Sequence, residues 1–273
     1  MRRFRHWVAN RGWRGLFRHV VQLVRWKVRG FWAGRRAWAG EGGEAPAQAP
    51  VTGPPLAVHP FDTRYGVETG GLIWSESLRS GESSEYWATG YYGVAPSVFW
   101  QALDRLGLEW PRFTFVDIGS GKGRGLMLAL RYPFRAVLGV ELSPELTRVA
   151  QGNLTEFRAE WRLPVPVEAV AGDATRLELP AGPLLLYLYH PFAAPVMDVL
   201  LERLRASIRR EPREVYLLYM NPELDGRLGA MPVVEKIWHE CFRLSEEDTR
   251  ADRFGSNQEY ASAYRFLLEE RLG

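Results

Sequence analysis

The feature that most constrains the fold is a short apolar run that ends in a dense cluster of glycines. Residues 113–118, FTFVDI, are apolar except for a threonine and Asp117, and the sequence GSGKGRG follows directly. An apolar run bounded by glycine is typical of a strand buried on both faces. Open α/β sheets bind ligands at a turn of this kind, at the carboxyl end of a strand. The sequence therefore predicts an α/β protein with a ligand site at this turn.

Strand-like and helix-like segments alternate along the chain. Strands are predicted at 113–118, 137–141, 167–171, 184–189 and 215–220, and two further candidates, 233–244 and 260–268, have no predicted helix between them. Helices are predicted after Ser97 as N-cap and over 124–132, 143–158 and 195–210. This alternation predicts a Rossmann-like, mostly parallel seven-stranded sheet with a C-terminal antiparallel hairpin and helices on both faces.

Composition divides the chain into three parts. Residues 1–38 carry eleven Lys and Arg and no acidic residue, and their apolar side chains fall largely opposite the arginines, which predicts a basic amphipathic helix. Residues 39–58 are rich in Gly, Ala and Pro and are predicted to be a linker. Residues 59–273 are the predicted folded domain, in which 59–96 precede the sheet.

The net charge of +3 hides an uneven distribution. Without residues 1–38 the chain has 24 basic and 32 acidic side chains, a balance of −8. The basic segment is predicted to contact a membrane surface or another anionic partner. A targeting leader and a helix packed on its own domain are the alternatives. The segment has too many charges for a membrane span and lacks the uncharged core of a secretory signal. Nucleic acid is not the expected partner, because the folded part is acidic.

Cysteine content limits the chemistry. The single cysteine, Cys241, excludes an intramolecular disulfide, and one thiol with five scattered histidines excludes a cysteine-based zinc site, so no metal is expected. We expect a cytoplasmic protein that contacts membranes peripherally through residues 1–38. Organellar targeting is the alternative for a eukaryotic source.

The glycine-rich stretch resembles a family motif. Residues 115–125, FVDIGSGKGRG, are similar to the first motif of class I S-adenosylmethionine (SAM)-dependent methyltransferases, a strand ending in an acid followed by G-x-G-x-G. The second predicted strand ends in Glu141, as the family's second strand ends in an acid. A dinucleotide-binding G-x-G-x-x-G would need glycine where the chain has Arg124 or Leu126. The resemblance covers about residues 90–270, and the loop is similar to that of non-SET protein lysine methyltransferases.

The resemblance implies SAM as the cofactor. It implies that Asp117 supports the loop and the amino-acid end of SAM, that Glu141 holds the ribose and that Asp173 contacts the adenine. A turn cap is the alternative for Asp173. The loop residues of the implied cofactor site are Gly119, Ser120, Gly121 and Gly123, whose glycines let backbone N–H groups approach a ligand. Lys122 and Arg124 are expected to face solvent without a role.

The fourth predicted strand leads into Tyr189-His-Pro-Phe192, at the place where the family handles the methyl acceptor. The tetrapeptide is similar to the Asn/Asp-Pro-Pro-Tyr/Phe motif of amino-group methyltransferases, but it has His190 in the first place and lacks the second proline. Tyr189, His190 and Phe192 are the predicted catalytic residues. A neutral imidazole can orient or deprotonate an acceptor near pH 7. A structural His190 at a strand end is the alternative.

The segment before the first strand is similar to the lid of related methyltransferases. Tyr91 and Tyr92 are expected to pack against the cofactor and Glu68 to face the acceptor, with ordinary loop packing as the alternative. After the fifth predicted strand, Asn221-Pro222 is either part of the rim of the site or a turn.

The sequence thus predicts a SAM-dependent methyltransferase with an unidentified acceptor and a preference for a protein side-chain nitrogen. Three alternatives stay open. They are a small-molecule N- or O-methyltransferase, a non-catalytic SAM-binding or membrane-associated module, and a nucleic-acid methyltransferase that grips phosphates with its basic arm.

Overall fold

The computed structural model describes residues 58–268, except 79, 253 and 255. The helix predicted over 1–38 and the linker predicted over 39–58, apart from its last residue, lie outside the described residues.

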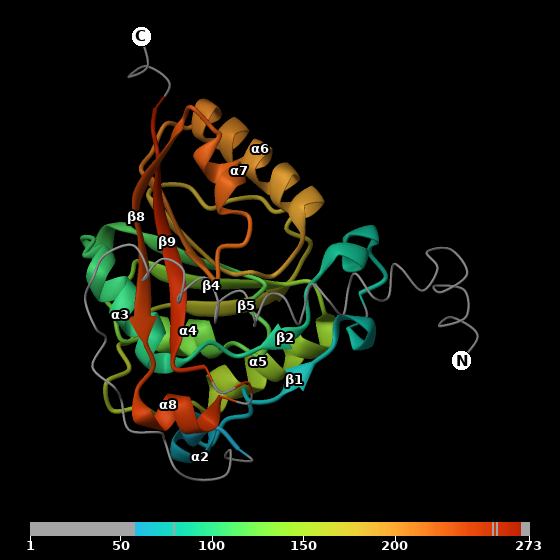
Figure 1. Ribbon diagram of the computed structural model, residues 1–273, viewed down its shortest axis with the longest axis vertical. Helices are drawn as coiled ribbons and strands as arrows, with labels where there is room; N and C mark the ends of the chain where they lie inside the picture. Colours follow the sequence, from blue (N-terminus) through green and yellow to red (C-terminus); the bar gives the residue numbers. More distant parts are fainter. Residues whose placement is uncertain (1–57, 79, 253, 255, 269–273) are drawn as a thin grey trace, which may run out of the picture. The chain divides into compact units, whose positions relative to one another are not determined.

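A seven-stranded sheet in the order β5-β4-β3-β6-β7-β9-β8 forms the centre of the described domain (Figure 1). Its strands are β3 Thr114–Ile118, β4 Ala136–Glu141, β5 Val167–Ala171, β6 Leu184–Tyr189, β7 Val215–Met220, β8 Val234–Arg243 and β9 Gln258–Phe266. Strands β3 to β7 pair in parallel, and β9 runs antiparallel to both β7 and β8. This confirms the predicted sheet and its C-terminal antiparallel hairpin.

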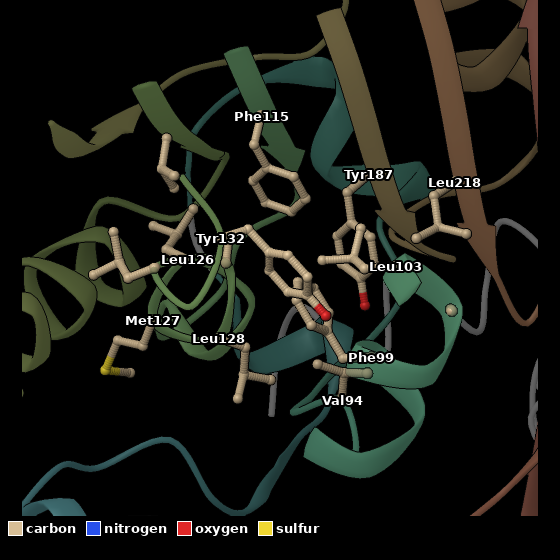
Figure 2. Close-up of a cluster of buried hydrophobic side chains, with 14 of the residues drawn as sticks. Val94, Phe99, Leu103, Phe115, Leu126, Met127, Leu128, Tyr132, Tyr187 and Leu218 are labelled. Atoms are coloured by element: carbon tan, nitrogen blue, oxygen red, sulfur yellow. The ribbon is translucent and has the colours of Figure 1, made fainter. Parts of the chain in front are cut away.

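Helices cover both faces of the sheet, as predicted. Helices α3 (Pro96–Leu106), α4 (Arg124–Ala129) and α5 (Pro144–Glu156) share one apolar core with the sheet, part of which Figure 2 shows. Helices α6 (Ala194–Arg210) and α7 (Asp225–Gly229) share the other. Because side chains alternate along a strand, Leu185 and Tyr187 of β6 join the first core, whereas Leu186 and Leu188 join the second.

The start of α3 differs from the prediction. Ala95, not Ser97, is the N-cap residue, and Pro96 occupies the first turn, where its fixed φ suits a helix start. The backbone N–H of Ser97 instead donates to Asp248 Oδ2 at 2.8 Å, and its hydroxyl accepts from Ser245 N at 3.0 Å. A tertiary contact therefore uses the side chain that the sequence suggested as a cap.

The prediction of no helix between the last two strands is wrong. Helix α8, Glu246–Ala251, lies there, with Ser245 as its N-cap accepting from Asp248 N at 3.1 Å. Its first turn is acidic, which the positive end of the helix dipole favours. A helix of six residues is too short to show the apolar periodicity on which the prediction relied.

The segment before the sheet is more regular than predicted. It contains helix α2 (Pro60–Tyr65), two turns of 3₁₀-helix, η1 (Ser75–Ser77) and η2 (Ser83–Trp87), and the antiparallel pair β1 (Leu72–Ile73) and β2 (Tyr91–Tyr92). Helices α2 and α8 lie side by side (Figure 1), joined by an ion pair of 2.6 Å between Arg64 and Glu247. The first and last parts of the described domain thus meet at one end of the sheet.

Candidate active site

A cavity lies at the carboxyl ends of β3, β4, β5 and β6 and encloses about 880 Å³ including its mouth. The strand order reverses between β3 and β6, which makes this the point where open α/β sheets bind ligands. Residues 88–94, together with Leu78 and Ser84, form the wall that the pre-sheet segment contributes.

Two buried carboxylates line the cavity at the ends of adjacent strands. Glu141 ends β4, and its two oxygens accept from Gly121 N at 2.8 Å and from Ser143 N at 2.9 Å. Burial raises the pKa of Glu141 in spite of these hydrogen bonds. Burial, and then the charge of Glu141, raise the pKa of Asp117 on β3 well above its usual value. A cationic ligand beside them would stabilise both in their charged form.

Asp173 lines the cavity just beyond β5. Its Oδ1 accepts from Thr175 N at 2.7 Å, so it caps a turn, and its Oδ2 accepts from the Ser84 hydroxyl at 2.7 Å. Partial burial acts to raise the pKa of Asp173, but these hydrogen bonds outweigh it and lower the pKa. The turn cap, which was the alternative for Asp173, is therefore present, and each carboxylate oxygen keeps a second lone pair.

The glycine loop works differently from the prediction. Four of its N–H groups are already hydrogen-bonded within the protein, since Gly119 and Ser120 donate to Val140 O, Gly121 donates to Glu141 and Gly123 donates to Ser120 O. Gly119 and Ser120 line the cavity, whereas Gly121 and Gly123 lie outside its lining. Glycine is required at 121 because φ is +53° and a Cβ would lie 2.2 Å from the Tyr91 ring. The loop is thus shaped by close contacts within the protein.

The prediction that Lys122 and Arg124 face solvent is wrong. Arg124 is 3% exposed, and its guanidinium donates to Thr69 Oγ1 at 2.7 Å and to Val94 O at 3.1 Å. Asp62 lies 3.7 Å from the same guanidinium and accepts from the Thr69 N–H and hydroxyl. Arg124 therefore anchors the pre-sheet segment to the start of α4.

Lys122 anchors the same segment on the other side of the loop. Its ammonium donates to Glu68 Oε1 at 2.6 Å and to Gly70 O at 3.1 Å. Glu68, which was expected to face the acceptor, is largely exposed and lies outside the cavity lining. Tyr91 and Tyr92 both line the cavity, and their hydroxyls reach Thr69 O at 2.5 Å and Asp252 Oδ1 at 2.7 Å.

The residues that end β6 separate into two groups. Tyr189 and Phe192 line the cavity, as does Pro191, and the Tyr189 hydroxyl donates to Glu259 Oε1 at 2.8 Å. His190 has φ of +42°, and its ring lies outside the cavity lining, stacked on Tyr219 with Nδ1 2.6 Å from the phenol oxygen. The His190 side chain therefore has a structural environment, the alternative given for it above, and it is not one of the groups that line the cavity.

The predicted rim at Asn221-Pro222 is a turn. Asn221 has φ of +47°, its N–H donates to Tyr260 O at 2.8 Å and its carbonyl accepts from Glu223 N at 2.8 Å. Neither residue lines the cavity.

No family model and no curated protein matches the chain, whereas solved structures do. One is TrmN from Thermus thermophilus, 18% identical over 64% of this chain and 49% of that one, with a TM-score of 0.46. Another is the magnesium protoporphyrin IX methyltransferase ChlM from Synechocystis PCC 6803 with bound SAM, 16% identical over 62% of this chain and 76% of that one, with a TM-score of 0.42. This chain spans about half the length of the Thermus protein.

The strand order settles the fold, because the antiparallel β9 lies between β7 and β8 next to five parallel strands. This is the class I methyltransferase fold. The resemblance read from the glycine loop is therefore confirmed at the level of the fold.

Several residues that line this cavity were not predicted. Tyr187 lines it from β6 with a buried hydroxyl that has no hydrogen-bond partner among the described residues, and the Ser120 hydroxyl is in the same state. Tyr187 lies within an apolar run, so only the alternation of β6 hints that it shares a face with Tyr189. Ser84 and Asp252 come from distant segments without a local signal.

Among residues 58–268, with the three gaps given above, no group of three His, Cys, Asp or Glu side chains is placed to hold a metal ion. Within the same residues, none of the helices has the length and apolar character needed to cross a bilayer.

His190 gives a testable pH dependence. Burial lowers the pKa of His190 to about 4, so the folded protein binds fewer protons than the unfolded chain between pH 4 and the usual imidazole value of 6.5. The free energy of unfolding should therefore fall as pH falls through this window, by up to roughly 3 kcal/mol from this group. Urea unfolding at pH 7 and pH 4 should show a smaller fall in His190→Gln. An equal fall in both proteins would contradict the expected contribution of His190.

Proposed function

We propose that this chain is a SAM-dependent methyltransferase whose cofactor lies at the ends of β3, β4 and β5. The observation that carries the proposal is the order of the cavity carboxylates, because Asp117 and Glu141 lie near the ends of β3 and β4, Asp173 follows β5, and all three line one cavity. Their expected partners are the amino-acid end, the ribose and the adenine of SAM.

The groups in the cavity suit this cofactor. SAM carries positive charges on its ammonium and sulfonium groups, which the carboxylate of Asp117 complements. Each oxygen of Glu141 accepts one backbone N–H and keeps a lone pair for a ribose hydroxyl. The Ser120 hydroxyl has no partner among the described residues and needs only a rotation about its Cα–Cβ bond to meet a ligand. A buried polar atom in this state is uncommon in proteins.

The protein would contribute to the reaction mainly by aligning the acceptor atom with the methyl group. When bound, SAM supplies an electrophilic methyl group, and in-line displacement depends on the distance and angle of the attacking atom. The pre-sheet segment helps to exclude water, because it is held over the cavity at both sides. Ser84 donates to Asp173, and Thr89 N donates to Pro191 O at 2.9 Å. These contacts tie the expected lid to β5 and β6.

Binding of SAM to the full chain, measured by calorimetry, tests the proposal. Ser120→Ala should weaken binding about five- to ten-fold, because it removes one hydrogen bond to the cofactor, and it should leave stability unchanged. Ser207→Ala is the matched control. Its hydroxyl, buried in α6 away from the cavity, accepts from Arg213 at 2.8 Å, so this variant should lose stability and keep SAM binding. No heat of binding for the wild type would refute the proposal.

Methyl transfer must be measured separately from SAM binding. Wild-type protein incubated with methyl-labelled SAM and a cell extract should place label in an acceptor fraction, and we expect that fraction to be protein. Label in small molecules would support the methyltransferase activity but show that the acceptor is a small molecule and not a protein. SAM binding without any transfer would favour the non-catalytic module.

Residues 1–38 remain, in this proposal, a separate basic segment that contacts a membrane surface or an anionic partner, and 39–58 remain the linker to the catalytic domain. The domain itself is acidic, so nucleic acid is not the proposed acceptor.

A further inference from the structure

The cavity has a buried cation in a wall that is otherwise acidic. Among the described residues, Arg124 is the only Lys, Arg or His in the lining of the cavity, whose other ionisable groups are carboxylates and phenols. The guanidinium lies against Gly93, a second lining residue, where a Cβ would be 2.7 Å from the Cζ atom of Arg124. Because Gly93 has no side chain, the guanidinium is not covered at this position.

The contacts that anchor the pre-sheet segment leave part of the Arg124 guanidinium unused. Of its N–H groups, Nε donates to Thr69 Oγ1 and Nη1 donates to Val94 O. Nη2 lies 3.7 Å from Asp62 Oδ1, which is too far for a hydrogen bond, and Asp62 already accepts from Thr69 and Gly70. A buried charge is stabilised well only when its remaining protons find acceptors. A bound anion would supply the acceptor that Nη2 lacks among the described residues.

The opposite charge lies close by, at Asp117. A Cβ at Gly125, the residue after Arg124, would lie 2.5 Å from Asp117 Oδ2, so this carboxylate contacts the start of α4. Asp117 and Arg124 do not form an ion pair in the described part of the chain, where the carboxylate paired with Arg124 is that of Asp62. The start of α4 therefore brings an anion and a cation to one end of the cavity without pairing them.

Tyr187 supplies a second donor on the same side. It is the register partner of Asp117 on β6, and a Cβ at Gly125 would lie 3.6 Å from its ring. Its hydroxyl, at the end of the side chain that projects from β6 in Figure 2, is buried and has no hydrogen-bond partner among the described residues. Burial, and then the charges of Asp117 and Glu259, raise the pKa of Tyr187 well above its usual value, so it keeps its proton. This end of the cavity therefore offers donors to a ligand that carries an acceptor.

We propose that Arg124 binds the carboxylate at the amino-acid end of SAM, opposite the ammonium group beside Asp117, and thereby couples cofactor binding to the pre-sheet segment. This inference rests on the proposed methyltransferase function and gives a recognition role to a residue that the G-x-G-x-G motif does not include. The amino-acid end of SAM is a zwitterion, so it needs one protein group of each charge. A guanidinium suits the carboxylate because its planar fork donates through parallel N–H groups.

The coupling follows from the contacts that Arg124 already makes. The same guanidinium holds Thr69 and Val94 of the pre-sheet segment. A carboxylate bound at Nη2 would restrain the guanidinium, and a ligand that binds only the closed arrangement stabilises that arrangement. The cofactor should therefore strengthen the contacts of the segment that forms one wall of its own cavity.

The test compares SAM with decarboxylated SAM, which differ only in the carboxylate, by calorimetry on the full chain. The carboxylates of Asp117, Glu141 and Asp173 alone would favour decarboxylated SAM, because its net positive charge is larger. We expect the wild type instead to bind SAM about ten-fold more tightly than decarboxylated SAM. Arg124→Lys keeps the charge but loses the planar fork, so it should reduce this preference to about two-fold.

Lys122→Met is the matched control. Lys122 also anchors the pre-sheet segment, through Glu68 and Gly70, but it lies outside the cavity lining. This variant should loosen the segment and keep the full wild-type preference for SAM.

Hydrogen exchange of the Thr69 N–H, which donates to Asp62 Oδ2 at 2.8 Å, measures the coupling. With each ligand at saturation, this exchange should be slower in the SAM complex than in the complex with decarboxylated SAM. The inference would be overturned by decarboxylated SAM binding the wild type as tightly as SAM, by an unchanged preference in Arg124→Lys, by an equal loss of preference in Lys122→Met, or by equal exchange at Thr69 in the two complexes. Failure of the wild type to bind either ligand would instead refute the proposed function.

Discussion

Gly121→Ala should unfold the glycine loop and, under the proposed function, abolish detectable SAM binding. A Cβ at this position would lie 2.2 Å and 2.3 Å from two carbons of the Tyr91 ring, and the backbone φ of +53° already disfavours any residue but glycine. The left-handed conformation costs alanine about 1–2 kcal/mol, and forcing Tyr91 aside adds about 1–3 kcal/mol. Urea unfolding should show a loss of about 2–5 kcal/mol, with calorimetry reporting SAM binding.

Gly152→Ala is the control for this prediction. Gly152 is exposed within α5, and a Cβ there would meet nothing within 4 Å. The change should stabilise the protein by about 0.5–1 kcal/mol, since glycine is costly inside a helix. Equal effects of the two substitutions would show that the contact with Tyr91 does not shape the loop.

Arg124→Met should release the pre-sheet segment from the sheet. The guanidinium is buried and holds Thr69, Val94 and Asp62, so its removal leaves a buried carboxylate without its cation. Breaking a buried pair in this way costs about 3 kcal/mol. Limited proteolysis should begin to cut the pre-sheet segment, and the free energy of unfolding should fall accordingly.

A surface arginine provides the comparison for Arg124. Arg112 pairs with Glu214 with both side chains well exposed, and exposed pairs contribute at most about 1 kcal/mol, so Arg112→Met should have little effect. The double variant Arg124→Met with Asp62→Asn should lose less stability than the sum of the losses in the two single variants, because both substitutions remove the same interaction. Simple additivity would mean that the two side chains do not interact.

The sheet could be predicted closely from the sequence because its strands are apolar and bounded by breakers. The runs at 167–171, 184–189 and 215–220 have the predicted bounds. Shorter elements such as α2 and α8 could not be predicted, since they are set by capping and by contact with each other. A six-residue helix has too few turns to show a periodic pattern.

The candidate site was predicted in part. Asp117, Glu141 and Asp173 line the cavity because the ends of parallel strands meet at one edge. The burial of Arg124 was missed because Asp62 and Thr69 stand more than 50 residues earlier, with no pattern linking them to the loop. The place of the His190 ring was missed because a positive φ at the strand end turns it toward Tyr219.

The position of β9 sets the order in which the chain can assemble. Among the described strands, β8 pairs with β9 alone, and β9 reaches the sheet by lying between β7 and β8. A growing polypeptide emerging from the ribosome therefore has nowhere to attach β8 until residues 258–266 have followed it. The same strand brings Glu259 to Tyr189, so the β6 side of the cavity is completed only after residues 258–266 have been made.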